Sequence, residues 1–188
     1  MTMVRSSCWL SVVTSASFAG APVVLAPLLA ALCTAAGAAY PQCVVAVLPR
    51  LDGAGLLKAL RGRAPKMQFL GRGGPRMRAI AGDKFRDWID ATAVVGLWEV
   101  IRRYPFFRKQ FRATISEIDA ARPSAVVLID YPGFNLRLAH ALRTKFSELK
   151  IIYYISPQVW AWNRRRVSQM AQSIDLMLCI FPFEPELY

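Results

Sequence analysis

Two short apolar runs constrain the possible fold of this chain more than any other feature of its sequence. Residues 126–129 read V-V-L-I, and residues 151–155 read I-I-Y-Y-I. Runs of this length that are apolar on both faces are typical of central strands in a parallel sheet covered by helices. Polar and turn-forming residues follow each run, beginning with Asp130 after the first and Ser156 after the second. Because ligands bind beyond the carboxyl ends of strands in open α/β sheets, we expect Asp130 and Ser156 to lie side by side at the rim of a site.

The remaining chain alternates between further strand-like and helix-like segments. Residues 96–112 are expected to form two helices divided at Pro105, since proline in a helix interior costs about 3 kcal/mol. The β-α alternation predicts an α/β fold with an open, mostly parallel sheet. We expect strands at residues 43–48, 68–71 and 175–180, and further helices at 53–61, 134–145 and 163–172, with others opening at Arg76 and at 181–184.

Composition narrows the classes of partner. The chain has 188 residues, enough for one domain with a substantial core. Its 24 lysines and arginines against 12 acidic residues give a net charge of +12, which favours nucleic acid, an anionic membrane or phosphorylated lipids as partners. Neither zinc-finger spacing nor an RNP-like aromatic pattern occurs, so nucleic acid is the weakest of these candidates. The four cysteines show no disulfide framework, and Cys179 is expected to be a buried thiol.

Residues 1–43 differ in composition from the rest of the chain. They carry a single charge, Arg5, and residues 18–39 form an uncharged, alanine-rich run interrupted by Pro22 and Pro27. Four interpretations of this hydrophobic leader stay open. It fits a signal peptide, a membrane span, an organellar transit peptide, or a start that has been assigned in the wrong place or reading frame.

Six segments carry a resemblance to a known family. They are residues 53–60 (G-A-G-L-L-K-A-L), 69–77 (F-L-G-R-G-G-P-R-M), 95–100 (V-G-L-W-E-V), 128–135 (L-I-D-Y-P-G-F-N), 153–162 (Y-Y-I-S-P-Q-V-W-A-W) and 181–184 (F-P-F-E). In this order they resemble motifs of the lipid-A-disaccharide synthases, the glycosyltransferases that join two acylated glucosamines in lipid A biosynthesis. The likeness extends over residues 53–188.

The resemblance implies a fold and a reaction. The implied fold is a Rossmann-like, doubly wound parallel sheet that forms the N-terminal half of a GT-B glycosyltransferase. Residues 44–188 would be the acceptor-side domain, and we expect the C-terminal donor domain to be absent from this chain. The implied reaction transfers diacylglucosamine from UDP-diacylglucosamine to diacylglucosamine 1-phosphate and releases UDP. It needs no cofactor, and the enzyme would act in the cytoplasm at the inner face of the inner membrane, although the leader leaves an anchored or organellar form open.

One loop departs from the family pattern. In the family, a Gly-Glu-x-Ser-Gly-Asp loop follows the first strand, whereas residues 47–52 here read V-L-P-R-L-D. A glycine-containing turn lets backbone N–H groups approach an anionic substrate, and Pro49 has no N–H group to offer. We therefore expect this part of the substrate site to differ from that of the family.

The chemistry of sugar transfer points to one carboxylate. A base must take the acceptor proton as the new bond forms, and Asp130 matches the catalytic aspartate of the family motif. A carboxylate at a strand end between apolar side chains can have its pKa raised towards working pH, although an aspartate before Tyr-Pro-Gly can also simply cap a turn. Expected substrate-binding residues are Gly96, Glu99, Asn135, Ser156, Gln158, Trp160 and Trp162. Helix capping is the alternative role for Asn135, and packing is the alternative for the tryptophans. No metal-ligand cluster is visible.

Aromatic and basic residues alternate in residues 96–112. This pattern suits a surface that enters a bilayer interface and meets anionic headgroups, and an acylated substrate favours that interpretation over an ordinary amphipathic helix. The expected membrane-contacting residues are Leu97, Trp98, Arg102, Arg103, Phe106 and Phe107.

Two other classes of function compete with the transferase. The chain could be a non-catalytic fragment that binds anionic lipid or membrane, which the departing loop favours. A basic nucleic-acid-binding protein is the third class, and it predicts duplex binding that weakens steeply with salt.

Overall fold

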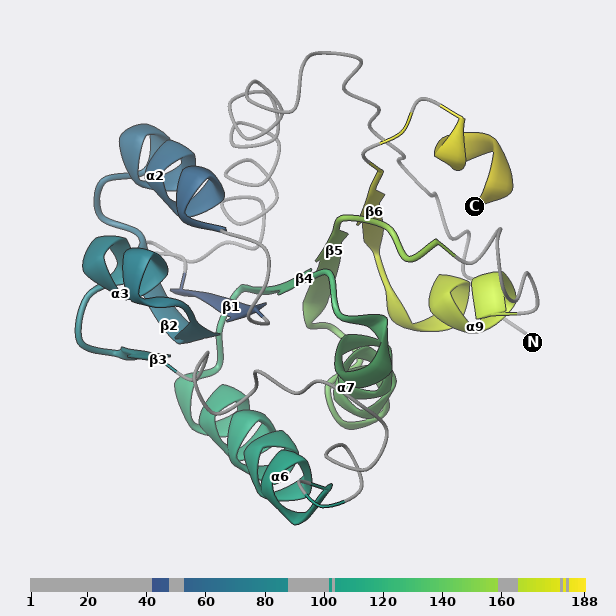
Figure 1. The fold of residues 1–188 in the computed structure, drawn as a ribbon, viewed down its shortest axis with the longest axis horizontal. Helices are drawn as coiled ribbons and strands as arrows, with labels where there is room; N and C mark the ends of the chain where they lie inside the picture. The colour runs from purple at the N-terminus through teal and green to yellow at the C-terminus, as the bar shows by residue number, and fades with distance from the viewer. Residues whose placement is uncertain are drawn as a thin grey trace.

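The computed structural model describes residues 42–47, 53–87, 102, 104–158, 166–179, 181 and 183–188. Residues 1–41 of the expected leader and the departing residues 48–52 lie outside these described residues. The described chain alternates strands with helices (Figure 1). In chain order the elements are β1 (Gln42–Val47), α2 (Ala54–Arg63), β2 (Gln68–Gly73), α3 (Pro75–Ala81), β3 (Phe85–Asp87), α6 (Tyr104–Ala121), β4 (Ala125–Ile129), α7 (Pro132–Lys145), β5 (Lys150–Tyr154), α9 (Arg166–Ser173), β6 (Leu176–Leu178) and the 3₁₀ helix η1 (Glu184–Leu187).

The strands form one parallel sheet. Its six strands run in the order β3-β2-β1-β4-β5-β6, and every neighbouring pair is parallel. The five residues of β4 are all buried, and so are the last four of β5. This burial confirms the prediction that the two apolar runs are central strands. The order 3-2-1-4-5-6 is that of a Rossmann-like, doubly wound sheet, so the predicted fold class is confirmed.

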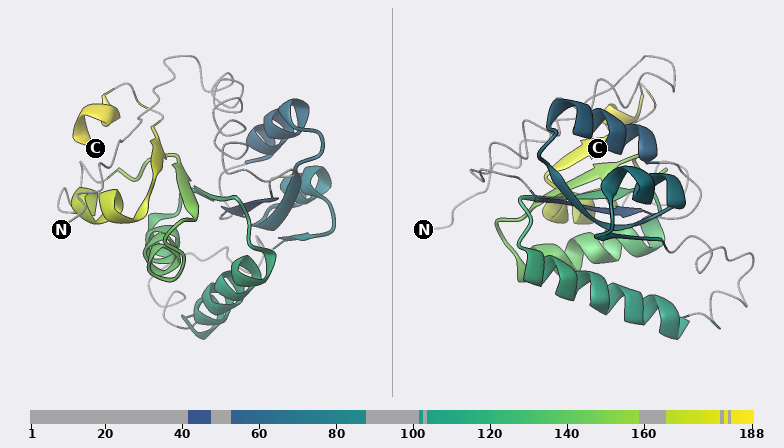
Figure 2. Two further views of the ribbon diagram at one scale, coloured as in Figure 1. Left: turned by 180° about the vertical axis from the view of Figure 1, so that it is seen from behind. Right: turned by 90° about the vertical axis from the view of Figure 1, so that its left-hand side faces the viewer.

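Helices cover both faces of the sheet (Figure 2). Helices α2 and α3 pack on one face, where Leu57 and Met77 join a core cluster with Val127 and Ile129 of β4. On the opposite face, α6, α7 and α9 pack in a second cluster that includes alternate residues of the same strand, such as Val126. This alternation follows from the two-residue period of a strand, which sends successive side chains to opposite faces.

Two features of the helices and strands differ from the sequence prediction. Strand β3 was not predicted, because only Phe85 among its three residues is buried. Helix α6 continues nine residues beyond the predicted end, and Pro105 lies in its first turn, where the missing N–H group costs no helical hydrogen bond. Of the residues expected to form a preceding helix, Arg102 and Tyr104 are described; Arg102 is helical, and Tyr104 is the first residue of α6. Across the described part of the chain, no helix is both long and apolar enough to cross a membrane.

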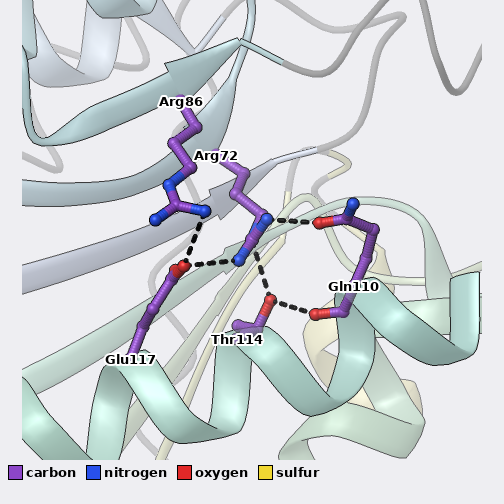
Figure 3. Close-up of polar contacts among 5 residues, drawn as sticks. All are labelled: Arg72, Arg86, Gln110, Thr114 and Glu117. Carbon is purple, nitrogen blue, oxygen red and sulfur yellow. Dashed lines mark hydrogen bonds and ion pairs between the residues drawn. The ribbon is translucent and has the colours of Figure 1, made fainter. Parts of the chain in front are cut away.

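Buried Arg72 joins α6 to the sheet (Figure 3). Only 3% of this β2 residue is exposed. Its guanidinium group donates to Thr114 Oγ1 at 3.0 Å, to Glu117 Oε1 at 2.8 Å and to the side-chain oxygen of Gln110. Glu117 also pairs with exposed Arg86 at 3.2 Å. Burial lowers the pKa of Arg72 and Glu117 opposes that change, so the buried charge depends on its partners from α6.

Gly73 allows close packing at the end of β2. A Cβ atom there would lie 2.8 Å from Met77 Sδ and 2.9 Å from Phe85 Cε1. Neighbouring side chains therefore occupy the space that a larger residue would need. This contact favours packing over ligand approach as the reason for a glycine at residue 73.

Candidate functional site

The strand order makes the carboxyl ends of β1 and β4 a topological switch point of the sheet. The chain leaves these two neighbouring strands in opposite directions, towards β2 and towards β5, and ligands of doubly wound folds bind at such a switch point. Val47 pairs with Ile129 at the ends of the two strands, so Asp130 is the first residue beyond β4 at the switch point.

The backbone at this point adopts an uncommon conformation. Asp130 has φ of +49° and Tyr131 has φ of +44°, and Ile155, just beyond β5, has φ of +69°. Left-handed backbone is uncommon outside glycine and is a true outlier for a β-branched residue such as isoleucine. Such strain costs about 1–3 kcal/mol per residue, persists only where the surroundings enforce it, and clusters at functional sites.

Buried and partly buried hydrogen bonds hold this turn. Asn135 is 1% exposed, and its Nδ2 donates to the carbonyl oxygens of Ile129 at 3.1 Å and Asp130 at 2.7 Å. The Tyr153 hydroxyl donates to the same Asp130 carbonyl at 2.6 Å, and the Asp130 N–H donates to Tyr154 O at 2.9 Å. The backbone of Asp130 is therefore held from both α7 and β5.

The environment changes the acidity of two groups at this turn. Partial burial raises the pKa of the Asp130 carboxyl, and a hydrogen bond from the Tyr131 N–H group opposes that change. Burial, together with the nearby Asp130 charge, raises the pKa of Tyr153 well above its usual range, so its hydroxyl keeps its proton and stays a donor. A carboxylate of raised pKa accepts a proton more readily near neutral pH.

Ser156 lies beyond the neighbouring strand but points inward. It is 3% exposed, and its Oγ donates to Glu184 Oε2 at 2.6 Å. The nearby thiol of Cys179 is 1% exposed, which confirms that it is buried. Burial raises its pKa to about 11 and makes it a poor nucleophile. The structure thus places Asp130 and Ser156 after adjacent strands. Of these two side chains, Asp130 is partly open to solvent and Ser156 is buried. Gln158, two residues further along the chain, is exposed.

Several expected site residues lie outside the described part of the chain. Among those that are described, Arg102 is exposed, and the rings of Phe106 and Phe107 meet edge to face with 5.7 Å between centroids. Phe107 packs partly against the core, whereas Tyr104, which was not singled out from the sequence, is 58% exposed. The expected residues outside the described ranges are Gly96, Leu97, Trp98, Glu99, Arg103, Trp160 and Trp162.

Sequence reasoning missed how the turn is held. Asn135 was expected to contact a sugar or cap a helix, and the bonds from its amide to the backbone at the end of β4 were not foreseen. Tyr153 was recognised only as part of an apolar strand. Its hydroxyl bridges to a residue 23 positions away, a contact for which a strand pattern gives no signal.

Comparison with known proteins gives one consistent result. Residues 50–188 match the family model described as lipid-A-disaccharide synthetase. The lipid-A-disaccharide synthase of Pseudomonas paraeruginosa is 40% identical over 136 residues, which cover 72% of this chain and 35% of that protein. Lipid-A-disaccharide synthase 1 of Legionella pneumophila is 42% identical over 71% of this chain and 34% of that protein. This chain thus spans about a third of the length of the curated relatives that it matches.

Proposed function

This chain belongs to the lipid-A-disaccharide synthetase family, and on that premise we propose that it supplies the acceptor side and the general base of a lipid-A-disaccharide synthase. The donor is UDP-diacylglucosamine, the acceptor is diacylglucosamine 1-phosphate, and the products are the lipid A disaccharide and UDP. In this assignment residues 44–188 form the acceptor-side domain.

One observation carries the proposal. Asp130 lies at the switch point of the sheet, on a left-handed turn held by Asn135 and Tyr153, with its pKa raised by burial. A carboxylate on a backbone held at this edge has the placement and the basicity that general-base catalysis needs.

The reaction step then follows. An acceptor hydroxyl attacks the anomeric carbon of the donor while the Asp130 carboxylate takes the hydroxyl proton. The new carbon–oxygen bond forms as the bond to UDP breaks, and the electron pair of that bond leaves with UDP. Asp130 gives the proton to solvent before the next cycle.

The acylated substrates place the reaction at a membrane surface. The start of α6 exposes Tyr104 beside three cations, Arg108, Lys109 and Arg112, and aromatic side chains next to cations suit an interface with anionic headgroups. We assign this end of α6, together with Arg102, to contact with the inner face of the inner membrane.

The proposal is tested by acceptor binding and turnover with the purified chain. We expect saturable binding of diacylglucosamine 1-phosphate in detergent micelles, and the disaccharide and UDP when the donor is added. A chain that binds the acceptor but forms no product would support the non-catalytic, lipid-binding alternative. A chain that neither binds nor reacts would refute the proposal.

A further inference from the structure

A pocket of about 500 Å³ lies between α7 and α9. We call it the α7–α9 pocket. It reaches the start of α7 at Pro132 and Gly133, directly after the Asp130 turn, and it continues past Arg137 and His140 of α7 and Arg166 of α9. None of the residues that line it is acidic. A basic lining without carboxylates selects for an anion.

The basic side chains of this pocket make no polar contact with the described fold. Within the described ranges, no hydrogen bond or ion pair engages the side chain of Arg137, His140 or Arg166. Other arginines of the same fold are engaged, since Arg72 binds Glu117 at 2.8 Å and Arg61 donates to Met67 O at 3.1 Å. The guanidinium groups of the pocket are therefore available to a ligand.

Helix geometry aligns these groups. Gly133, Arg137 and His140 are separated by four and three residues, so they lie on one face of α7. A Cβ atom added at Gly133 would meet nothing within 4 Å, which leaves the start of the helix open. The 14-residue helix α7 also directs the positive end of its dipole to this point.

We propose that the α7–α9 pocket binds a phosphomonoester group. A phosphate offers several oxygens to two guanidinium groups, which bind it through paired, charge-assisted hydrogen bonds. Apolar lining residues, including Leu136 and Met170, suit the carbon skeleton attached to the phosphate. Because the pocket adjoins Asp130, the phosphate is that of the acceptor, an assignment that rests on the proposed function.

Calorimetric titration of the full chain with glucosamine 1-phosphate tests the site. We expect saturable 1:1 binding, and no binding of glucosamine, which lacks the phosphate. The double variant Arg137→Gln/Arg166→Gln should bind at least about 100-fold more weakly, because it removes both guanidinium groups that make charge-assisted hydrogen bonds to the phosphate. The matched control is Arg63→Gln/Arg78→Gln, which removes the same charge from exposed positions of α2 and α3 on the opposite face, and it should bind like the native chain.

Two further probes distinguish the sources of the phosphate. Inorganic phosphate tests the anion alone, and dodecyl phosphate below its micelle concentration tests a phosphate that carries an acyl-like chain. Tighter binding of dodecyl phosphate would support an amphiphile as the ligand, and equal binding of the two would support a free phosphate. Equal losses in the pocket and control variants, or no saturable binding of any phosphate, would overturn the site.

Asp130→Asn separates this inference from the proposed function. The variant should bind glucosamine 1-phosphate like the native chain, because the carboxyl is not among the lining residues. Phosphate binding by a native chain that forms no disaccharide would keep the pocket and refute the general-base role of Asp130, whereas a native chain that forms disaccharide without phosphate binding at this pocket would overturn the pocket alone. Circular dichroism of both double variants checks their folding, which the exposed positions of these arginines should preserve.

Discussion

Asp130 is held in a left-handed backbone conformation that most side chains disfavour. Its carbonyl oxygen accepts two partly buried hydrogen bonds, from Asn135 at 2.7 Å and from Tyr153 at 2.6 Å. The residue is thus constrained through its backbone, while its carboxyl is partly buried and accepts a hydrogen bond from the Tyr131 N–H group. Substitutions of Asn135 or Tyr153 can therefore test how the turn is held, and a substitution of Asp130 can test the carboxylate.

The raised pKa of Asp130 predicts a gain in stability when the carboxyl is removed. Burial makes the folded state hold the Asp130 proton more tightly than the unfolded state does. That stabilising contribution is fully present below the unfolded pKa of about 3.9 and is lost as pH rises through the folded pKa. An asparagine side chain cannot ionise and still accepts the Tyr131 N–H bond, so we expect Asp130→Asn to unfold at higher urea concentration than the native chain at pH 7, and at a similar concentration near pH 3.5. A native chain that gains stability relative to this variant between pH 3.5 and 7 would contradict the raised pKa.

Tyr153→Phe should weaken the turn at Asp130 without leaving a cavity in the core, because the aromatic ring is kept. The substitution removes only the hydroxyl that bonds Asp130 O, which lowers the free energy of unfolding by about 1 kcal/mol. We also expect slower turnover with little change in KM for the acceptor, because the base is less well positioned. Tyr154→Phe is the control, since no described group bonds its hydroxyl. Equal effects of the two substitutions in urea denaturation and in turnover would contradict a specific role for Tyr153.

Helix α6 is attached to the sheet through polar contacts as well as apolar ones. Its contacts with β2 run through buried Arg72 and three residues of the helix (Figure 3). Removing the partners of a buried cation lowers the free energy of unfolding, and so does removing the cation from a half-buried carboxylate. The position of α6 is thus fixed by charge as well as by apolar packing.

Arg72→Met should lower the free energy of unfolding by about 3 kcal/mol, because it leaves Glu117 to exposed Arg86 alone. Arg86→Met should cost less than about 1 kcal/mol, since that side chain is exposed. Urea denaturation of both variants checks this difference. The double variant Arg72→Met/Glu117→Met should recover part of the loss, and a double variant less stable than Arg72→Met would contradict the account.

The elements also show how far sequence reasoning reaches. Central strands such as β4 were predictable because all five of their residues are apolar and buried. Strand β3 was not, since Arg86 and Asp87 are exposed and their pairing with β2 is decided by backbone hydrogen bonds. The position of Asp130 followed from the strand that precedes it. The bonds that hold its turn did not, because Asn135 and Tyr153 reach it from other elements.

At the scale of the whole molecule, the excess of positive charge is large. The chain carries a net charge of +12, and exposed cations lie on both faces of the sheet, in α2 and α3 as well as in α6. A uniform charge would attract any polyanion. If one surface contacts the membrane, the cations on that surface should contribute more to the binding of anionic vesicles than cations elsewhere.

Vesicle binding tests whether the start of α6 is that surface. Replacing Arg108, Lys109 and Arg112 with glutamine should weaken sedimentation with anionic vesicles by about 100-fold, at about 1 kcal/mol for each cation. Added salt should weaken binding of the native chain. The control replaces Lys58, Arg63 and Arg78, which removes the same charge from the opposite face, and equal losses would show general charge attraction rather than contact through α6.

The most direct test of the central claim is the initial rate of disaccharide formation by Asp130→Asn. Asparagine keeps the size of the side chain and the bond from the Tyr131 N–H group but cannot take a proton. We expect a rate about 10²–10⁴-fold below that of the native chain, unchanged acceptor binding, and no effect of Asp83→Asn, which changes an exposed carboxylate in the turn between α3 and β3. An Asp130→Asn variant that forms the disaccharide at the native rate would show that Asp130 is not the base.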